Sequence, residues 1–69
     1  MSSEYEGLLY KKGVAINNLR PVGTIRINNQ DYSAVSNGQW IIKDTPVKVV
    51  QVDGTKVLVE KIISEQTHA

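Results

Sequence analysis

Cysteine and phenylalanine are both absent from this chain of 69 residues, which has one tryptophan and two prolines. Without cysteine, neither disulfide bonds nor thiolate metal clusters can stabilise the fold. A chain of this length buries only about 60% of the surface that its unfolded form exposes. We therefore expect one small domain of modest stability, whose sheet must enclose a hydrophobic core by closing on itself.

An excess of charge of one sign is also lacking. Eight Lys and Arg residues against seven Asp and Glu give a formal net charge of +1. A protein that neutralises several phosphates needs a marked basic excess, so we expect no nucleic-acid partner. No apolar run approaches the roughly 20 residues of a membrane helix, and the first residues lack a signal-peptide pattern. We expect no direct membrane insertion by this segment.

Residues that would form a catalytic site are few and poorly placed. The single histidine, His68, lies next to the last residue, where it cannot be held in catalytic geometry. Asp31, Asp44 and Asp53 each lie beside a predicted turn, where aspartate bonds to nearby backbone. The serines have no base, and there is no glycine loop that would hold a phosphate. We predict no enzymatic activity, no cofactor and no metal.

Alternating apolar residues predict short β-strands throughout. Asn28-Asn29 and Asp53-Gly54 separate alternating runs and are typical of tight hairpin turns. The alternation slips by one residue near Val50-Gln51, which predicts a β-bulge. No segment shows helical periodicity. The strands are expected at residues 13–17, 24–28, 31–35, 47–52 and 55–62, and the fold class is all-β, a small five-stranded OB-fold-like β-barrel with essentially no helix.

The stretch from Leu19 to Gly23 predicts a sharp corner after the first strand. Proline fixes φ and removes a backbone donor, while glycine permits positive φ. We expect Leu19 in the core and Arg20 exposed. The polar ends predict flexible tails at residues 1–6 and 64–69, which flank a domain at residues 7–63.

The sequence Trp40-Ile41-Ile42 offers a candidate protein contact. Adjacent strand residues point to opposite faces, so an inward Ile41 places Trp40 and Ile42 outward. Tryptophan is enriched at interface hot spots, and Val50 and Leu58 would extend this contact. In the alternative arrangement, Trp40 lies flat over one end of the barrel and closes the core.

A basic patch is the second candidate site. Four cations could converge near Pro21, with an aromatic ring on which a base would stack, as in OB-fold proteins that bind single-stranded nucleic acid or oligosaccharide. We favour instead an ordinary solvated surface, because strands alternate and four cations do not exceed the usual density of charge on a protein surface. The residues of this candidate patch are Tyr10, Lys11, Lys12, Arg20 and Arg26.

A family resemblance extends over residues 7–60. The chain resembles the soluble C-terminal domain of NfeD-like proteins, the partners of stomatin- and flotillin-type membrane proteins. It departs from that pattern at Asn29 and Asp44, where the family usually has glycine, although both residue types tolerate positive φ. The matching residues are Gly7-Leu8, 13–23, Ile27, Tyr32, 34–36, Ile41, Thr45, Val47, Val49, 52–54 and 57–60.

The resemblance implies an OB-fold barrel that follows transmembrane helices in the full-length protein. It therefore implies an excised soluble domain of a membrane-anchored protein, which we expect on the cytoplasmic side. The function implied is a non-catalytic interaction module that assembles with a stomatin/flotillin-type membrane protein or associates with itself as a homo-oligomer. The serine-protease domain of some family members has no counterpart in these residues.

Overall fold

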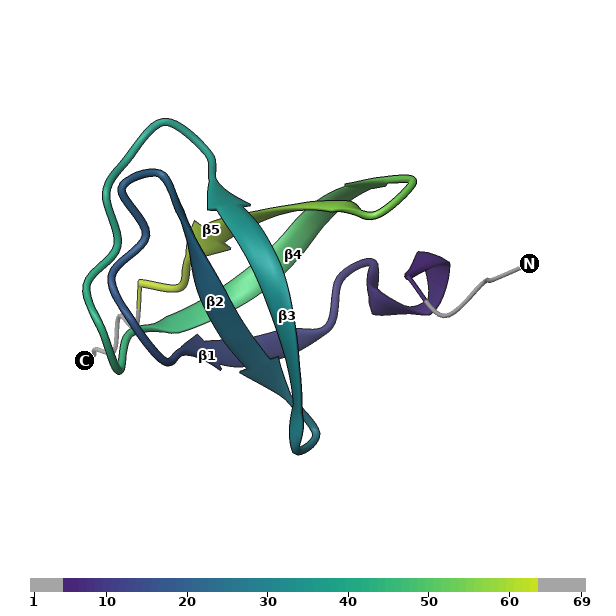
Figure 1. Cartoon of the computed structure of the whole chain (residues 1–69), viewed down its shortest axis with the longest axis horizontal. Helices are drawn as coiled ribbons and strands as arrows, with labels where there is room; N and C mark the ends of the chain where they lie inside the picture. Colours follow the sequence, from purple (N-terminus) through teal and green to yellow (C-terminus); the bar gives the residue numbers. More distant parts are fainter. Residues whose placement is uncertain (1–4, 64–69) are drawn as a thin grey trace, which may run out of the picture.

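Five strands and one short 3₁₀ turn make up the computed structural model, which describes residues 5–63 (Figure 1). The strands close into a barrel in the order β1-β2-β3-β5-β4, and β4 pairs again with β1. This confirms the predicted all-β barrel. The predicted C-terminal tail, with His68, and residues 1–4 of the predicted N-terminal tail lie outside the described residues. The elements are η1 (Glu6–Leu8), β1 (Lys12–Ala15), β2 (Val22–Ile27), β3 (Gln30–Ser36), β4 (Pro46–Asp53) and β5 (Lys56–Lys61).

Two hairpins and one parallel contact determine the strand register. β2 and β3 pair through the Asn28-Asn29 turn, where both residues have positive φ, and β4 and β5 pair through a turn at Gly54, also with positive φ. The β4–β5 register shifts between Val49 and Gln51, so the predicted β-bulge is confirmed. β3 and β5 then close the barrel by parallel pairing at two positions.

Inward-facing side chains from every strand fill the barrel. Leu8 of η1 contributes to this core from one end, and Leu19 and Ile41 contribute from the loops. Tyr5 packs edge-on against Tyr32, with ring centroids 5.8 Å apart, although the sequence places Tyr5 in the predicted tail. The domain limits remain a prediction. The buried apolar residues are Leu8, Ala15, Leu19, Ile25, Ile27, Tyr32, Ala34, Ile41, Val47, Val49, Val57 and Val59.

Asp44 adopts the left-handed conformation, with φ of 73°, in the loop before β4. Its backbone N–H donates to the Ala15 carbonyl at 2.7 Å, which ties this loop to β1. A side chain in this conformation costs roughly 1–2 kcal/mol, and aspartate reduces that cost by local hydrogen bonding. Asp44 therefore has a backbone conformation that glycine adopts readily. This agrees with the glycine that the family usually has at this position.

Asp44→Gly is expected to leave the free energy of unfolding unchanged or to raise it by up to about 1 kcal/mol, because glycine adopts positive φ without strain. Asp44→Ala is expected to lower it by about 1 kcal/mol, because alanine has neither that freedom nor a local hydrogen bond. Urea denaturation followed by circular dichroism checks both variants. A glycine variant less stable than the alanine variant would contradict this explanation.

Candidate partner-binding surface

Leu19 and Ile41 join two loops at one end of the barrel. The Leu19 N–H donates to the Ile41 carbonyl at 2.7 Å, and the Ile41 N–H donates to the Leu19 carbonyl at 3.1 Å. Both side chains are buried in the core. The loop between β1 and β2 and the loop between β3 and β4 therefore run antiparallel at this end, on the left in Figure 1. Leu19 lies in the core and Arg20 is exposed, as the sequence predicts.

Trp40 and Ile42 point outward from this pair of loops. Each is 69% exposed, whereas Ile41 between them is 2% exposed. The predicted alternation is confirmed, and Trp40 does not close the barrel. The guanidinium carbon of Arg20 lies 5.5 Å from the Trp40 ring centroid, within the range of a cation–π contact. We call Arg20, Trp40, Ile42 and the adjacent exposed Lys43 the Trp40 surface.

Asparagine side chains hold both loops in place. The Asn18 Oδ1 accepts a hydrogen bond from the Lys43 N–H at 2.8 Å, which links the two loops directly. The Asn17 Oδ1 accepts one from the Thr24 N–H at 2.9 Å, which fixes the first loop to β2. A surface held in this way loses less conformational entropy on binding than a mobile loop would lose.

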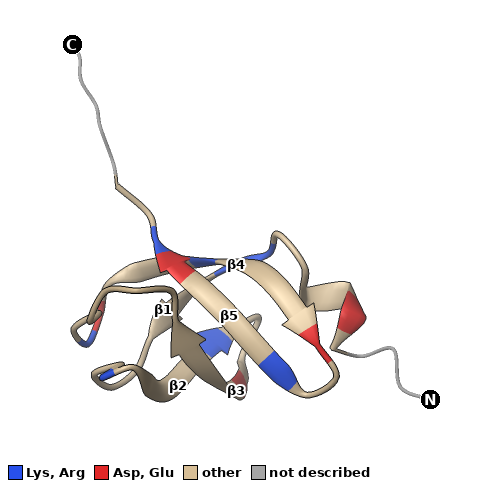
Figure 2. Ribbon diagram, turned by 90° about the horizontal axis from the view of Figure 1, so that it is seen from above, with Lys and Arg blue, Asp and Glu red and all other residues tan. Residues whose placement is uncertain are grey.

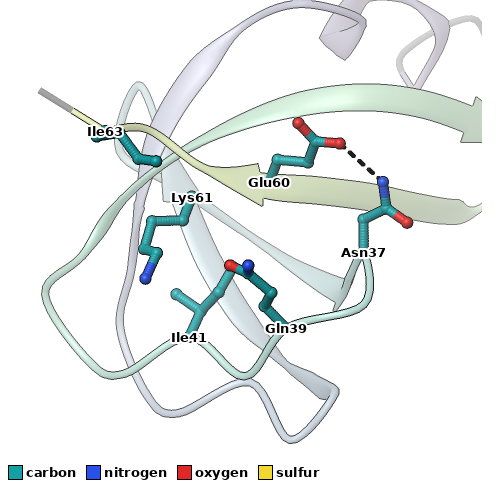
Figure 3. Close-up of a pocket in the computed structure, with 6 residues that line it drawn as sticks. All are labelled: Asn37, Gln39, Ile41, Glu60, Lys61 and Ile63. Carbon is teal, nitrogen blue, oxygen red and sulfur yellow. Dashed lines mark hydrogen bonds between the residues drawn. The ribbon is translucent and has the colours of Figure 1, made fainter.

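A depression of about 240 Å³ lies between the β3–β4 loop and the end of β5 (Figure 3). The Asn37 Nδ2 donates to the Glu60 Oε2 at 2.8 Å, and this bond ties the loop to β5. Figure 3 shows Glu60 and Lys61 pointing away from each other. The lining residues are Asn37, Gln39, Ile41, Glu60, Lys61 and Ile63. Amides, one carboxylate and one ammonium suit hydrogen bonding to a ligand.

The part of the chain that the structure describes offers little for catalysis. Residues 5–63 contain no histidine and no group of three His, Asp or Glu residues that could hold a metal ion. The Ser36 hydroxyl is buried without a hydrogen-bond partner in the structure.

Val50 and Leu58, the predicted extensions of the contact site, lie elsewhere. Both are half-buried in strands β4 and β5. Val50 lines a depression with Lys12 and Lys48, and Leu58 lines another with Gln51. Neither depression includes Trp40 or Ile42, so the structure does not join these four residues into one patch.

The residues of the predicted basic patch make separate contacts in the structure. The Arg26 Nε donates to the Asp31 Oδ1 at 2.8 Å, and this hydrogen bond lowers the pKa of the exposed Asp31 carboxyl. Arg20 instead stacks on Trp40. Lys12 lies directly opposite Lys48 across β1 and β4. Tyr10 and Lys11 are exposed in the segment before β1. No single stacking platform with converging cations results.

No feature of the sequence indicates the stacking between Arg20 and Trp40. These residues lie twenty positions apart, and they meet because Leu19 pairs with Ile41. The sequence indicates that Leu19 and Ile41 point inward. It does not reveal that these two positions pair with each other. The depression beside Lys61 was missed for the same reason, because it forms between two segments that are distant in the sequence.

A closed five-stranded barrel with fixed end loops and an exposed aromatic and basic surface defines a small OB-type binding domain. The sequence model of the family described as NfeD-like C-terminal, partner-binding domain matches residues 5–61. The chain belongs to this family.

The chain is similar to a curated protein and to a solved structure. Membrane protein NfeD1b of Bacillus subtilis (strain 168) is 38% identical over 55 residues, which cover 80% of this chain and 13% of that protein. The chain thus spans about an eighth of its curated relative. The C-terminal domain of stomatin operon partner protein 1510-C from Pyrococcus horikoshii superposes with a TM-score of 0.83 at 25% identity, covering 91% of this chain and all of that one.

Residues 5–63 form no helix with the length and apolar character needed to cross a membrane. The curated relative nevertheless carries the name of a membrane protein.

Proposed function

We propose that the chain is the non-catalytic interaction module of a membrane-anchored NfeD-like protein, and that it binds a stomatin- or flotillin-type membrane protein through the Trp40 surface. The observation that carries this proposal is the exposed Trp40 on a fixed pair of loops, stacked against Arg20. The match to a partner-binding family and the resemblance to a stomatin operon partner protein support it.

The energetics of the surface agree with such a role. Tryptophan and arginine are the residue types most enriched at interface hot spots, where truncation of one side chain costs 2 kcal/mol or more. Trp40 and Ile42 expose apolar area that binding would remove from water, at about 25 cal/mol per Å² before the costs of association. Because hydrogen bonds already fix the loops, little of this gain is spent on ordering them.

The membrane anchor in this proposal lies outside the 69 residues. The relative named as a membrane protein is much longer than this chain, so its remaining segments have room for membrane spans. We place the barrel on the cytoplasmic side and expect it to reach its partner while tethered. Protease digestion of sealed vesicles that contain the full-length protein tests the side: cytoplasmic barrels are cut only in inside-out vesicles.

The double variant Trp40→Glu and Ile42→Glu is expected to weaken binding to a purified stomatin-type protein from the same genome by at least about 30-fold, because two apolar contacts become charges. Biolayer interferometry measures the dissociation constant, and circular dichroism confirms the fold. Tyr10→Glu is the matched control, since Tyr10 is 66% exposed and lies outside the Trp40 surface. Equal binding by the folded double variant and the control would exclude the Trp40 surface.

A further inference from the structure

The end of the barrel opposite the Trp40 surface carries an acidic hollow. It has a volume of about 290 Å³ and lies between η1 and the β4–β5 turn. Two carboxylates, Glu6 and Asp53, line it together with the ring of Tyr5 and the side chain of Val52, and its lining includes no basic residue. We call it the Glu6 hollow. Its lining residues are Tyr5, Glu6, Val52, Asp53, Gly54 and Thr55.

The Trp40 surface and the Glu6 hollow lie at opposite ends of the molecule. In Figure 1, the two joined loops are on the left, and η1 and the β4–β5 turn are on the right. Figure 2 shows acidic positions on η1 and at the end of β4 in red. Because the two surfaces lie at opposite ends, a contact between the Trp40 surface of one copy and the Glu6 hollow of another places the two barrels head to tail.

The two ends complement each other in charge and in apolar character. Arg20 and Lys43 bring positive charge beside Trp40, and neither belongs to the ion pair found among residues 5–63, which joins Arg26 to Asp31. The hollow offers carboxylates beside an aromatic ring. A guanidinium stacked on tryptophan therefore finds both an anionic and an apolar partner there.

We propose that the Trp40 surface also binds a second copy of this chain, whose Glu6 hollow receives Trp40 and faces Arg20 with its carboxylates. This inference rests on the proposed function, in which the Trp40 surface is the binding surface. Each copy keeps one free end after the contact forms. Such a heterologous contact builds an open row of barrels unless a rotation happens to close it.

The size of the end face makes this contact weak. The two shorter extents of the molecule are 23 and 22 Å. An end face of that cross-section is roughly 400 Å² per copy, or about 800 Å² in total, which is below the roughly 1,200 Å² at which stable specific interfaces begin and fits only a weak, transient contact. Rows would thus form at high protein concentration, or where many copies are anchored in one membrane. A stomatin-type partner would compete with the second copy for Trp40.

Two variants that each disable one end test this arrangement. Trp40→Glu disables the Trp40 surface. The pair Glu6→Lys and Asp53→Lys disables the Glu6 hollow. In sedimentation velocity, we expect the unmodified chain to grow in average mass with concentration, without stopping at a dimer. Each variant alone should associate at least about ten times more weakly than the unmodified chain. An equimolar mixture of the two should form dimers and nothing larger.

Asp31→Lys is the matched control, because it makes the same kind of charge change on the barrel wall at an exposed ion pair, and it should associate like the unmodified chain. A monomeric unmodified chain, a closed dimer, or a mixture that stays monomeric would overturn the inference. If the unmodified chain stays monomeric yet binds a stomatin-type protein through Trp40, only this inference fails. If it forms rows but binds no such protein, the head-to-tail contact stands and the proposed partner is wrong.

Discussion

Gly13→Ala is expected to lower the free energy of unfolding by about 3 kcal/mol, the upper part of the range for overpacked sites. A Cβ at Gly13 would overlap the backbone carbonyl oxygen of Arg26 and would lie 2.6 Å from the Cγ1 of Ile27. Both groups belong to β2, which pairs with β1 at this place. The backbone cannot withdraw without breaking the ladder, so the strands must separate.

A chain of this length has a free energy of unfolding of about 3–10 kcal/mol, so Gly13→Ala should leave much of the protein unfolded at the lower end of that range. Urea denaturation followed by far-ultraviolet circular dichroism measures the change. Gly7→Ala serves as the control, because a Cβ at Gly7 meets no atom within 4 Å. If both variants unfold at the same urea concentration, close packing against β2 is not the reason that glycine occupies position 13.

Leu19→Ala is expected to lower the free energy of unfolding by about 2–5 kcal/mol, the range for emptying a fully buried leucine site. The loss should also reach the Trp40 surface, because Leu19 holds the first loop against Ile41. Binding to the stomatin-type partner should therefore weaken even under conditions where the variant is folded.

Leu9→Ala provides the comparison for Leu19→Ala, since Leu9 is 40% exposed. This substitution is expected to lower the free energy of unfolding by less than about 1 kcal/mol. Chemical denaturation gives the stability of both variants, and biolayer interferometry gives their affinities for the partner. Full affinity of a folded Leu19→Ala protein would show that the loop pairing does not support the surface. Equal stability of the two variants would contradict the core position of Leu19.

Local rules were sufficient to predict most of the barrel. Period-two alternation located the five strands, and the change of phase at Val50-Gln51 located the bulge that the β4–β5 register shows. Asn29 and Asp44 have positive φ, as their places in the family pattern imply. Strand alternation predicted that Trp40 and Ile42 share a face opposite to Ile41, but it left open whether Trp40 covers the barrel end, and the structure shows Trp40 exposed.

Features that depend on long-range pairing were beyond sequence reasoning. The 3₁₀ turn η1 is three residues long, too short to show any periodicity, yet Leu8 closes one end of the core. Positive φ at Tyr10 is uncommon for a bulky residue and has no sequence signal. The prediction that Val50 extends the contact at Trp40 is not met, because the barrel separates the middle of β4 from the end loops.

The most direct test is to map the contact of a stomatin-type protein on the isotope-labelled chain by NMR spectroscopy. Addition of the unlabelled partner should shift or broaden the amide signals of residues 18–20 and 40–43, together with the indole N–H of Trp40. Signals at the outer positions of β2 and β3 should stay unchanged. Perturbations confined to β2 and β3, or none at saturating partner, would contradict partner binding through the Trp40 surface.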